Sequence, residues 1–430
     1  MAGIEIPNET VINWQAPPLK FGIGATDEIG EHLRQMGVGK VLVVTDRHVE
    51  EVGIPGRVVG SIEAAGVEAE VFAGSHVEPT DRSIREALDE LSGEEFDGYV
   101  GVGGGSSLDT AKAIDLLKTY PDDLMRYVNK PVGEGAPVPG PVKPLVAVPT
   151  TSGTGSESTP VCVVDLLDLK VKAGISSNHV RPWLAVVDPL NTLTMSPEVT
   201  AAGGYDVMTH ALESYTSRHY DRRPRYPDRA NRPAYIGANP ISDVWCERAL
   251  ELVGRFLRRA VLNGDDLEAR TGMAMAAAFA GMGFGNAGVH VPHAIAYPIA
   301  GGVREYVPRG YAGVDEPLVP HGQSVIVTAA ATFEFTYPTA PERHVRAAQL
   351  LGASLEGVGE ADAARLLPST VLEIVKDTGG PLGVSAFGYG EEDVAALVEG
   401  TLKQERLLSG CPREVGAPEL EAIVRASLAG

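Results

Sequence analysis

An acid and a histidine lie four residues apart in the otherwise apolar stretch "AGGYDVMTHALES", at Asp206 and His210. Residues four apart on a helix share one face, so these two side chains can converge on one ion. A hydrogen-bonded Asp–His pair inside a helical core is the alternative. The pattern therefore indicates a candidate metal site, provided that the chain supplies further ligands.

Histidines further along the chain favour the metal site. His290 and His293 lie in the apolar, glycine-flanked stretch "FGNAGVHVPHAIAYPIAG", and His321 lies between Pro and Gly in "PLVPHGQSV". Such residues are seldom buried without a partner. Three neutral imidazoles and one carboxylate, without a thiolate, suit Fe(II), Zn, Co or Mn. The sequence therefore predicts a site for one such ion.

A glycine-rich turn in the first half of the chain could hold a phosphate. The stretch "GYVGVGGGSSLDTAKA" has the pattern of a strand, three glycines, two serines and a helix. Glycines let the backbone approach a phosphate closely, and the N–H groups that open a helix attract negative charge. Because the glycines are not spaced as in the common dinucleotide fingerprint, a tight strand-to-helix turn is an equal alternative.

Two further loops favour a dinucleotide. The stretch "VPTTSGTGSES" also follows a predicted strand and brings together hydroxyl groups that could bind phosphate or ribose. These are Thr150, Thr151, Ser152, Thr154 and Ser156. Asp46 ends an earlier strand, where a carboxylate can accept hydrogen bonds from ribose hydroxyls and repel a 2′-phosphate. A solvated turn residue or a helix N-cap is the alternative for Asp46. Together the three loops predict NAD rather than NADP.

The two halves of the chain that must position these residues differ in their predicted secondary structure. Short β-branched runs predict strands at 40–46, 69–74, 97–105, 144–150 and 184–189, and helical patterns lie between them at 27–36, 82–91 and 107–117. This alternation is typical of a parallel sheet covered by helices. Ser196 and Pro197 have the types expected at a helix start, and further helices are predicted at 242–262 and 265–282. We expect an α/β nucleotide-binding domain over 1–195 and an all-α domain over 196–430.

Composition narrows the classes of protein. The formal charge of −21 argues against nucleic acid and anionic membranes as partners, and no stretch is long and apolar enough for a membrane span. The three cysteines at Cys162, Cys246 and Cys411 are too scattered for a disulfide framework or a thiolate zinc site. The N-terminus lacks the pattern of a secretory signal. We therefore expect a cytoplasmic protein, with an organelle form that has lost its transit segment as the alternative.

The motifs together resemble the iron-containing (group III) alcohol dehydrogenase family. They are "GGGSSLD", "PTTSGTGSE", "GYDVMTHALES", "GVHVPHAIAYP" and "VPHGQSV", they occur in the family order, and they span nearly the whole chain. The resemblance implies NAD and a metal, Fe(II) or another of the ions above, held by Asp206, His210, His293 and His321, with His290 as a neighbour. It implies cofactor contacts at Asp46, Gly103, Gly104, Gly105, Ser106, Asp109, Thr150, Thr151, Ser152, Thr154 and Lys172. An ordinary surface lysine is the alternative for Lys172.

One departure from the family pattern points to a branch. Many members carry another histidine four residues after the third ligand, where this chain has Tyr297 in "HAIAYPIAG". This residue, with the insert at 217–240, is similar to the hydroxyacid–oxoacid transhydrogenase branch. That resemblance implies that bound NAD accepts hydride from a 4-hydroxybutyrate-like hydroxyacid and passes it to 2-oxoglutarate. Tyr297 either relays a proton with water or only packs.

Several expectations complete this hypothesis. Arg232 in the arginine-rich insert, or His290, could bind a substrate carboxylate, although a solvated loop is the alternative for the insert. The partners are small alcohols, hydroxyacids and oxoacids, and we expect a homo-oligomer, a dimer. Three other functions stay open: a dehydrogenase or aldehyde reductase that uses free NAD(H), a lyase of the dehydroquinate-synthase type, and a binding protein without chemistry.

Overall fold

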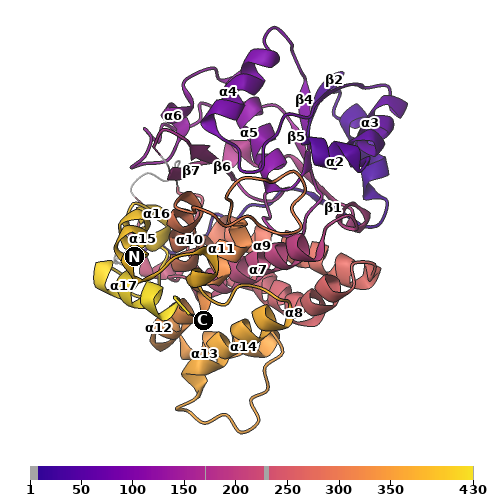
Figure 1. The fold of residues 1–430 in the computed structure, drawn as a ribbon. Coiled ribbons are helices and arrows are strands. Elements are labelled where there is room, and N and C mark those ends of the chain that lie inside the picture. Colours follow the sequence, from indigo (N-terminus) through magenta and orange to yellow (C-terminus); the bar gives the residue numbers. More distant parts are fainter. Residues whose placement is uncertain (1–7, 170, 227–231, 430) are drawn as a thin grey trace, which may run out of the picture.

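The chain folds into a parallel α/β half and a helical half that pack against each other (Figure 1). The structure is a computed structural model that describes residues 8–169, 171–226 and 232–429. In Figure 1 the first half, in indigo to magenta, lies above the second half, in orange to yellow. Helices of the second half therefore lie directly against the α/β half, so residues of both halves can meet.

The first half is built on a six-stranded sheet in the order β1-β8-β5-β4-β2-β3, in which all neighbouring strands are parallel. The strands are β1 Leu19–Phe21, β2 Lys40–Val44, β3 Glu68–Phe72, β4 Gly98–Gly103, β5 Leu145–Pro149 and β8 Leu184–Val187. All five predicted strands are present. The strand β1 was not predicted, and at three residues it is too short to show a pattern.

Helices cover both faces of this sheet. They are α1 Ile29–Gln35, α2 Arg47–Glu51, α3 Ile54–Ala64, α4 Asp81–Glu90, α5 Gly105–Thr119 and α6 Leu124–Tyr127. Alternate side chains of β2 enter different cores, with Val41 and Val43 in one and Leu42 and Val44 in the other. Burial on both faces explains why the strand reads as a continuous apolar run, as parallel sheets do.

A buried carboxyl in α5 makes the stability of this half depend on pH. Asp115 is inaccessible to solvent and accepts hydrogen bonds from the backbone N–H of Lys143 and the hydroxyl of Thr119, while its Oδ2 has no hydrogen-bond partner in the described part of the chain. Burial raises its pKa to about 8. The folded state therefore holds this proton more strongly than the unfolded chain, and its contribution to stability is lost as the pH rises toward 8.

We expect Asp115→Asn to be more stable than the wild type by about 2 kcal/mol at pH 8, because the variant never has to bury a charge there. The difference should shrink as the pH falls to 5. Urea unfolding at several pH values measures it. Asp89→Asn, at an exposed position of α4, is the control and should stay within about 0.5 kcal/mol throughout. A difference that does not change with pH would contradict the prediction.

An antiparallel hairpin, β6 Val161–Leu166 and β7 Val171–Ser176, lies outside the main sheet. Sequence analysis did not predict it. It brings Asp165 opposite Lys172 in the register of the two strands. The hairpin packs against α5, so it is held beside the glycine-rich turn that opens that helix.

The second half is helical, and the predicted fold class is confirmed. Its helices are α7 Pro197–Thr216, α8 Pro240–Leu262, α9 Leu267–Ala287, α10 Val291–Gly301, α11 His321–Ile326, α12 Ala329–Thr336, α13 Pro341–Leu350, α14 Ala363–Asp377, α15 Val394–Leu402, α16 Glu405–Leu408 and α17 Ala417–Ala426. Ser196 caps α7 by accepting the N–H of Val199, as predicted. None of the helices in the described part of the chain is long and apolar enough to cross a membrane.

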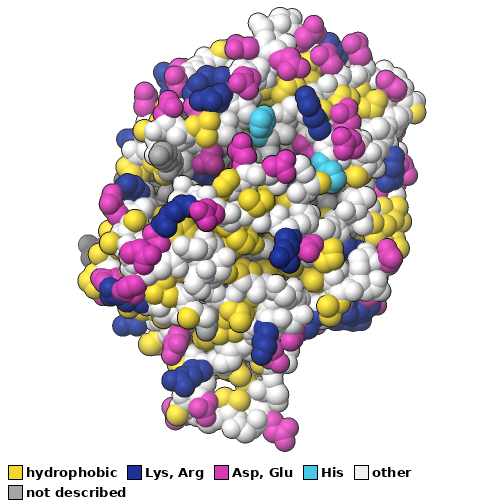
Figure 2. All heavy atoms as spheres, in the orientation of Figure 1, with side chains coloured by type: hydrophobic (Ala, Val, Ile, Leu, Met, Phe, Trp, Pro, Cys, Tyr) yellow, Lys and Arg dark blue, Asp and Glu magenta, His cyan; other side chains and the backbone are white. Residues whose placement is uncertain are grey.

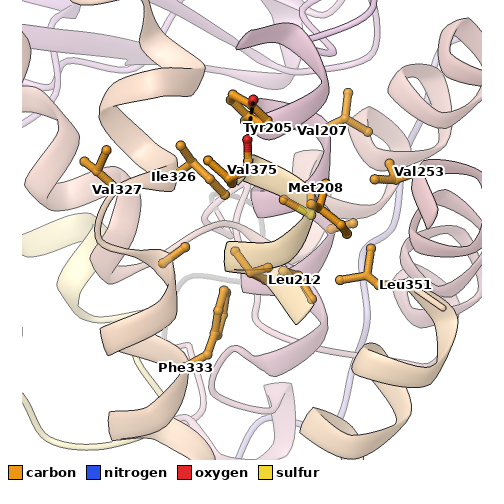
Figure 3. Close-up of a cluster of buried hydrophobic side chains, with 14 of the residues drawn as sticks. Tyr205, Val207, Met208, Leu212, Val253, Ile326, Val327, Phe333, Leu351 and Val375 are labelled. Carbon is orange, nitrogen blue, oxygen red and sulfur yellow. Dashed lines mark hydrogen bonds between the residues drawn. The ribbon is translucent and has the colours of Figure 1, made fainter. Parts of the chain in front are cut away.

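The helix α7 is the central element of this half. Met208 and Leu212 on α7 pack against Phe333 and Leu351 from later helices, and Tyr205 hydrogen-bonds the carbonyl of Val375 (Figure 3). Because this apolar packing surrounds α7, Asp206 and His210 are carried by one of the most firmly held helices of the chain. The boundary at 195/196 falls just before this helix and stays a prediction.

Glycines let the two halves touch backbone to backbone. A Cβ on Gly153, in the hydroxyl-rich turn, would lie 3.0 Å from the Cα of Gly203 on α7. A Cβ on Gly155 would lie 2.8 Å from the Cα of Gly281 on α9. Any side chain at these positions would push the turn away from the helices, so the close contact depends on glycine.

Acidic side chains, interspersed with Lys and Arg, are spread over the face of the molecule that Figure 2 shows. The arginine-rich insert is partly described, and Arg229 lies outside the described residues. The part that the structure describes includes a short 3₁₀ turn at Tyr220–Arg222 and a bridge from His219 to Ala238.

Candidate metal and nucleotide site

A pocket of about 600 Å³ lies where the carboxyl ends of the parallel strands meet the helical half. This edge of an open α/β sheet is the usual place for a ligand. The glycine-rich turn after β4, the hydroxyl-rich turn after β5 and the histidines of α7, α10 and α11 all line it. The pocket therefore joins the phosphate-binding and metal-binding motifs that lie far apart in the sequence.

Imidazole nitrogens surround one carboxylate oxygen at the helical end of the pocket. Oδ1 of Asp206 lies 3.5 Å from Nε2 of His210, 3.5 Å from Nε2 of His293 and 3.8 Å from Nε2 of His321. Four ligand atoms bound tetrahedrally at about 2.1 Å from an ion are about 3.4 Å apart. These spacings therefore match a first coordination shell.

The four side chains do not form an equally tight set. The ligand atoms of Asp206, His293 and His321 all lie within 4.8 Å of one another, and His210 is not part of that group. The His210 ring stacks on Phe284, with a centroid distance of 3.8 Å, and on His293 at 4.6 Å. Thus His210 faces Asp206, while its ring position is fixed by stacking.

Unsatisfied polar atoms show that the cluster fits a cation. Oδ1 of Asp206 and Nε2 of His293 are buried and have no hydrogen-bond partner among the described residues. Buried polar atoms are almost always paired, so two unsatisfied ligand atoms that face each other suit a bound cation. The donor set of one oxygen and three nitrogens suits Fe(II), Zn, Co or Mn equally well.

Electrostatic coupling within the cluster is strong. Burial disfavours the charged forms of Asp206 and His293. The imidazoles nevertheless hold the pKa of Asp206 below its usual range. The carboxylates of Glu213 and Asp206 raise the pKa of His293 to about 9. Burial lowers the pKa of His210 to about 3. In the metal-free protein the His293 ring therefore carries a second proton near neutral pH, and its positive charge offsets the buried carboxylates. Metal binding has to displace this proton.

Glu213, which sequence analysis missed, orients His293. It is inaccessible to solvent on α7, and its Oε1 accepts the backbone N–H groups of His290 and His293 at 2.8 and 3.3 Å. Its Oε2 contacts Nδ1 of His293, which leaves Nε2 directed at Asp206. Carboxylates commonly orient metal-binding histidines in this way. Its position seven residues after Asp206 and three after His210 was the available signal.

We expect Glu213→Gln to weaken metal binding about 10- to 100-fold, since an amide is a weaker acceptor for the His293 ring N–H. A chelator-competition titration of the full chain measures the affinity. Glu247→Gln removes a charge from α8, where Glu247 accepts the Tyr215 hydroxyl outside the pocket, and should leave the affinity unchanged. Equal affinities in both variants would show that Glu213 does not position the ligand.

The glycine-rich turn provides an open helix terminus. No side chain caps α5 at Gly104, so its first N–H groups are free to bind an anion. A Cβ on Gly105 would lie 2.6 Å from Cγ2 of Thr154, so this glycine lets the two turns pack together. Most of the predicted cofactor residues line the pocket, namely Asp46, Gly104, Gly105, Ser106, Asp109, Thr150, Thr151, Thr154 and Lys172.

Two predicted cofactor residues do not line the pocket. Gly103 packs against Ser107, where a Cβ would come within 2.4 Å of its Oγ. Ser152 is buried, and its backbone carbonyl lies against Gly203. Both residues pack inside the turns in this structure, and their contact with a cofactor stays a prediction.

A buried ion pair that sequence analysis missed holds the two turns together. Lys112 on α5 donates to Oγ of Ser156 and to the carbonyl of Val161, both at 2.7 Å. Asp109 accepts the Ser156 hydroxyl and the N–H of Val163. Lys112 lies one helical turn after Asp109, but nothing in its own pattern distinguished it from a surface lysine.

Asp46 and Lys172 have partners within the protein as well as access to the pocket. Asp46 caps α2 by accepting the N–H of Val49, which was one of its alternatives, and also accepts the hydroxyl of Ser107. Lys172 is buried and paired with Glu78 and Asp165. Burial opposes its charge, but these carboxylates raise the pKa of Lys172, so it remains protonated.

Tyr297 lines the pocket, whereas the two residues suggested for a substrate carboxylate do not. The Tyr297 ring lies 6.4 Å from the His321 ring, and burial raises its pKa to about 12, so it keeps its proton near neutral pH. His290 is buried against Glu213 and Thr216. Arg232 pairs with Glu9 at 3.4 Å. The structure therefore places both residues outside the pocket lining and gives no support to either as the carboxylate site.

Comparison with known families identifies the class of protein. Residues 17–189 match "Iron-containing alcohol dehydrogenase", and residues 234–428 match the C-terminal part of the same family. The chain therefore belongs to the iron-containing alcohol dehydrogenase family. It is an NAD-linked, metal-dependent oxidoreductase.

Curated relatives cover almost the whole chain. It is 46% identical over 412 residues to the mitochondrial hydroxyacid-oxoacid transhydrogenase of Xenopus laevis, covering 95% of this chain and 89% of the relative. It is 45% identical to that of Homo sapiens, covering 95% and 88%. Among solved structures, a 1,3-propanediol oxidoreductase is 31% identical with a TM-score of 0.84, covering 97% of this chain and 100% of the other.

These relatives correct the expected location. They are named as mitochondrial proteins, which overturns the expectation of a cytoplasmic one. That expectation depended on the small number of cysteines and on the lack of a secretory signal pattern in the N-terminal residues. The three cysteines are free and buried, and a reducing environment is not specific to the cytoplasm.

Proposed function

We propose that this chain is a hydroxyacid–oxoacid transhydrogenase, which oxidises a 4-hydroxybutyrate-like hydroxyacid and reduces 2-oxoglutarate with NAD retained between the two half-reactions. The single observation that carries the proposal is the shared pocket, in which an open helix terminus, a hydroxyl-rich turn and a carboxylate–imidazole cluster face one space. The names of the curated relatives support the choice of substrates.

Each part of the pocket has a role in this proposal. Asp206, His210, His293 and His321 would hold the metal, with iron as the ion that the family name indicates. Residues from the turns after β2, β4 and β5 would hold NAD, and Asp46 would favour it over NADP. When bound, the ion lowers the pKa of the substrate hydroxyl and NAD carries the hydride.

The surrounding side chains prepare the site for this chemistry. Glu213 keeps the proton of His293 on Nδ1, so that Nε2 is free as a ligand. Phe284 and Val289 form an apolar wall that excludes water next to the cluster. Tyr297 keeps its hydroxyl proton near neutral pH and can donate a hydrogen bond, but it cannot act as a base there.

One experiment separates a transhydrogenase from a dehydrogenase that uses free NAD. The purified protein is denatured, and the released nicotinamide cofactor and metal are quantified. The native protein is then given 4-hydroxybutyrate and 2-oxoglutarate without added NAD. Retained cofactor together with formation of 2-hydroxyglutarate supports the proposal. Turnover only after NAD is added would assign a dehydrogenase instead, as the alcohol dehydrogenase family name allows.

A further inference from the structure

We propose that Arg406 on α16 binds the carboxylate of the hydroxyacid and oxoacid substrates. This inference rests on the proposed function for the identity of those substrates. Lys172 and Arg406 are the two lysine or arginine side chains that line the pocket among the described residues. A substrate carboxylate needs a cation with free hydrogen-bond donors, so these two residues are the candidates.

The partners of the two cations differ. Lys172 is buried and already paired with both Glu78 and Asp165, so its charge is compensated within the protein. The guanidinium of Arg406 pairs with no carboxylate among the described residues, and its polar neighbour is Tyr235, although the side chain is only partly exposed. Arg406 is thus the cation of the pocket that remains available to a ligand.

The position of Arg406 relates it to the metal cluster. The short helix α16 packs on α10, which carries His293 and Tyr297. Leu407 and Leu408, which follow Arg406, pack with Tyr297, Phe284 and Val289 in one apolar cluster. Apolar side chains next to Arg406 therefore also pack on the helix that carries His293, and several of them line the pocket. This is the environment that the methylene groups of a hydroxyacid would occupy between a hydroxyl and a carboxylate.

An aromatic ring orients the guanidinium. The Arg406 guanidinium lies over the Tyr235 ring, 4.9 Å from its centroid, and Tyr235 also lines the pocket. A guanidinium carries five N–H donors, so a contact with one ring leaves donors available for a carboxylate. Bidentate pairing distinguishes a carboxylate from the neutral amide of the same size.

Equilibrium binding of non-reacting probes tests this role without turnover. Isothermal titration of the holoenzyme compares butyrate with butyramide, which have the same shape but differ in charge. We expect the wild type to prefer butyrate and Arg406→Gln to lose that preference by about 10- to 100-fold, with Arg406→Lys intermediate. Arg413→Gln is the matched control, because Arg413 lies over the Phe335 ring at 4.4 Å and does not line the pocket.

The outcomes distinguish this inference from the proposed function. If Arg406→Gln, folded as judged by its thermal unfolding, keeps the wild-type preference, or if the wild type has none, the role of Arg406 is overturned whatever the protein catalyses. If the preference is lost in Arg406→Gln but no hydride passes to 2-oxoglutarate, Arg406 stands as the carboxylate site and transhydrogenation fails.

Discussion

Replacing His293 with alanine will reduce metal binding more than 100-fold and reduce hydride transfer to background. Removing a residue that only orients a ligand costs about 10- to 100-fold in metal affinity, so the loss of a ligand should exceed that range. His293 also contacts both Asp206 and Glu213, so its removal leaves two buried carboxylates without their shared partner. Elemental analysis of the purified variant and a chelator titration measure the metal, and single-turnover assays measure the transfer.

The matched control is another buried imidazole. His344 on α13 is hydrogen-bonded to Thr336 and to the carbonyl of Ala340, and it does not line the pocket. His344→Ala should lower stability by about 1 to 3 kcal/mol through its lost hydrogen bonds while keeping the wild-type metal content. If His293→Ala also keeps full metal content, the cluster is not the metal site.

Replacing Gly322 with alanine will separate α11 from α7 and lower kcat about 100-fold. A Cβ at this position would lie 1.8 Å from the carbonyl oxygen of Ala202, so the two helices would have to move apart by about 1 Å. Gly322 directly follows His321, and displacement of a reacting group by about 1 Å costs about 100-fold in rate. Overpacking should also cost about 1 to 3 kcal/mol of unfolding free energy. Steady-state kinetics and urea unfolding measure both effects.

Gly60 on α3 provides the control for this substitution. No atom lies within 4 Å of a Cβ built there, and its backbone is helical. Gly60→Ala should therefore raise the unfolding free energy by about 0.5 to 1 kcal/mol and leave kcat unchanged. Wild-type kinetics in Gly322→Ala would mean that the α7–α11 spacing does not control the site.

The fold was largely predictable from the sequence because a parallel sheet buries both faces of its strands. Runs such as that of β2 are continuously apolar and contrast clearly with the helices between them. The hairpin β6–β7 was missed because its strands mix buried and half-buried residues, including Asp165 and Lys172. The role of these two charged residues is explained only by their pairing across the hairpin.

The residues of the candidate site that lie in recognisable motifs were predictable from the sequence. Asp206, His210, His293 and His321 lie in short stretches of unusual type, so their convergence could be expected. Lys112 and Arg406 could not be distinguished in the same way, and Glu213 had only its spacing from Asp206 and His210 as a signal. Their roles depend on contacts between segments distant in sequence, and a glutamate, lysine or arginine is by itself an ordinary surface residue.

The layout of the pocket constrains the order of events in the proposed reaction. Among the described residues it has a single carboxylate–imidazole cluster and a single guanidinium without a carboxylate partner. A donor hydroxyacid and an acceptor oxoacid carry the same two groups, so they would compete for the metal and Arg406 in their proposed roles. We therefore expect the first product to leave before the second substrate binds, which gives ping-pong kinetics with inhibition by either substrate in excess.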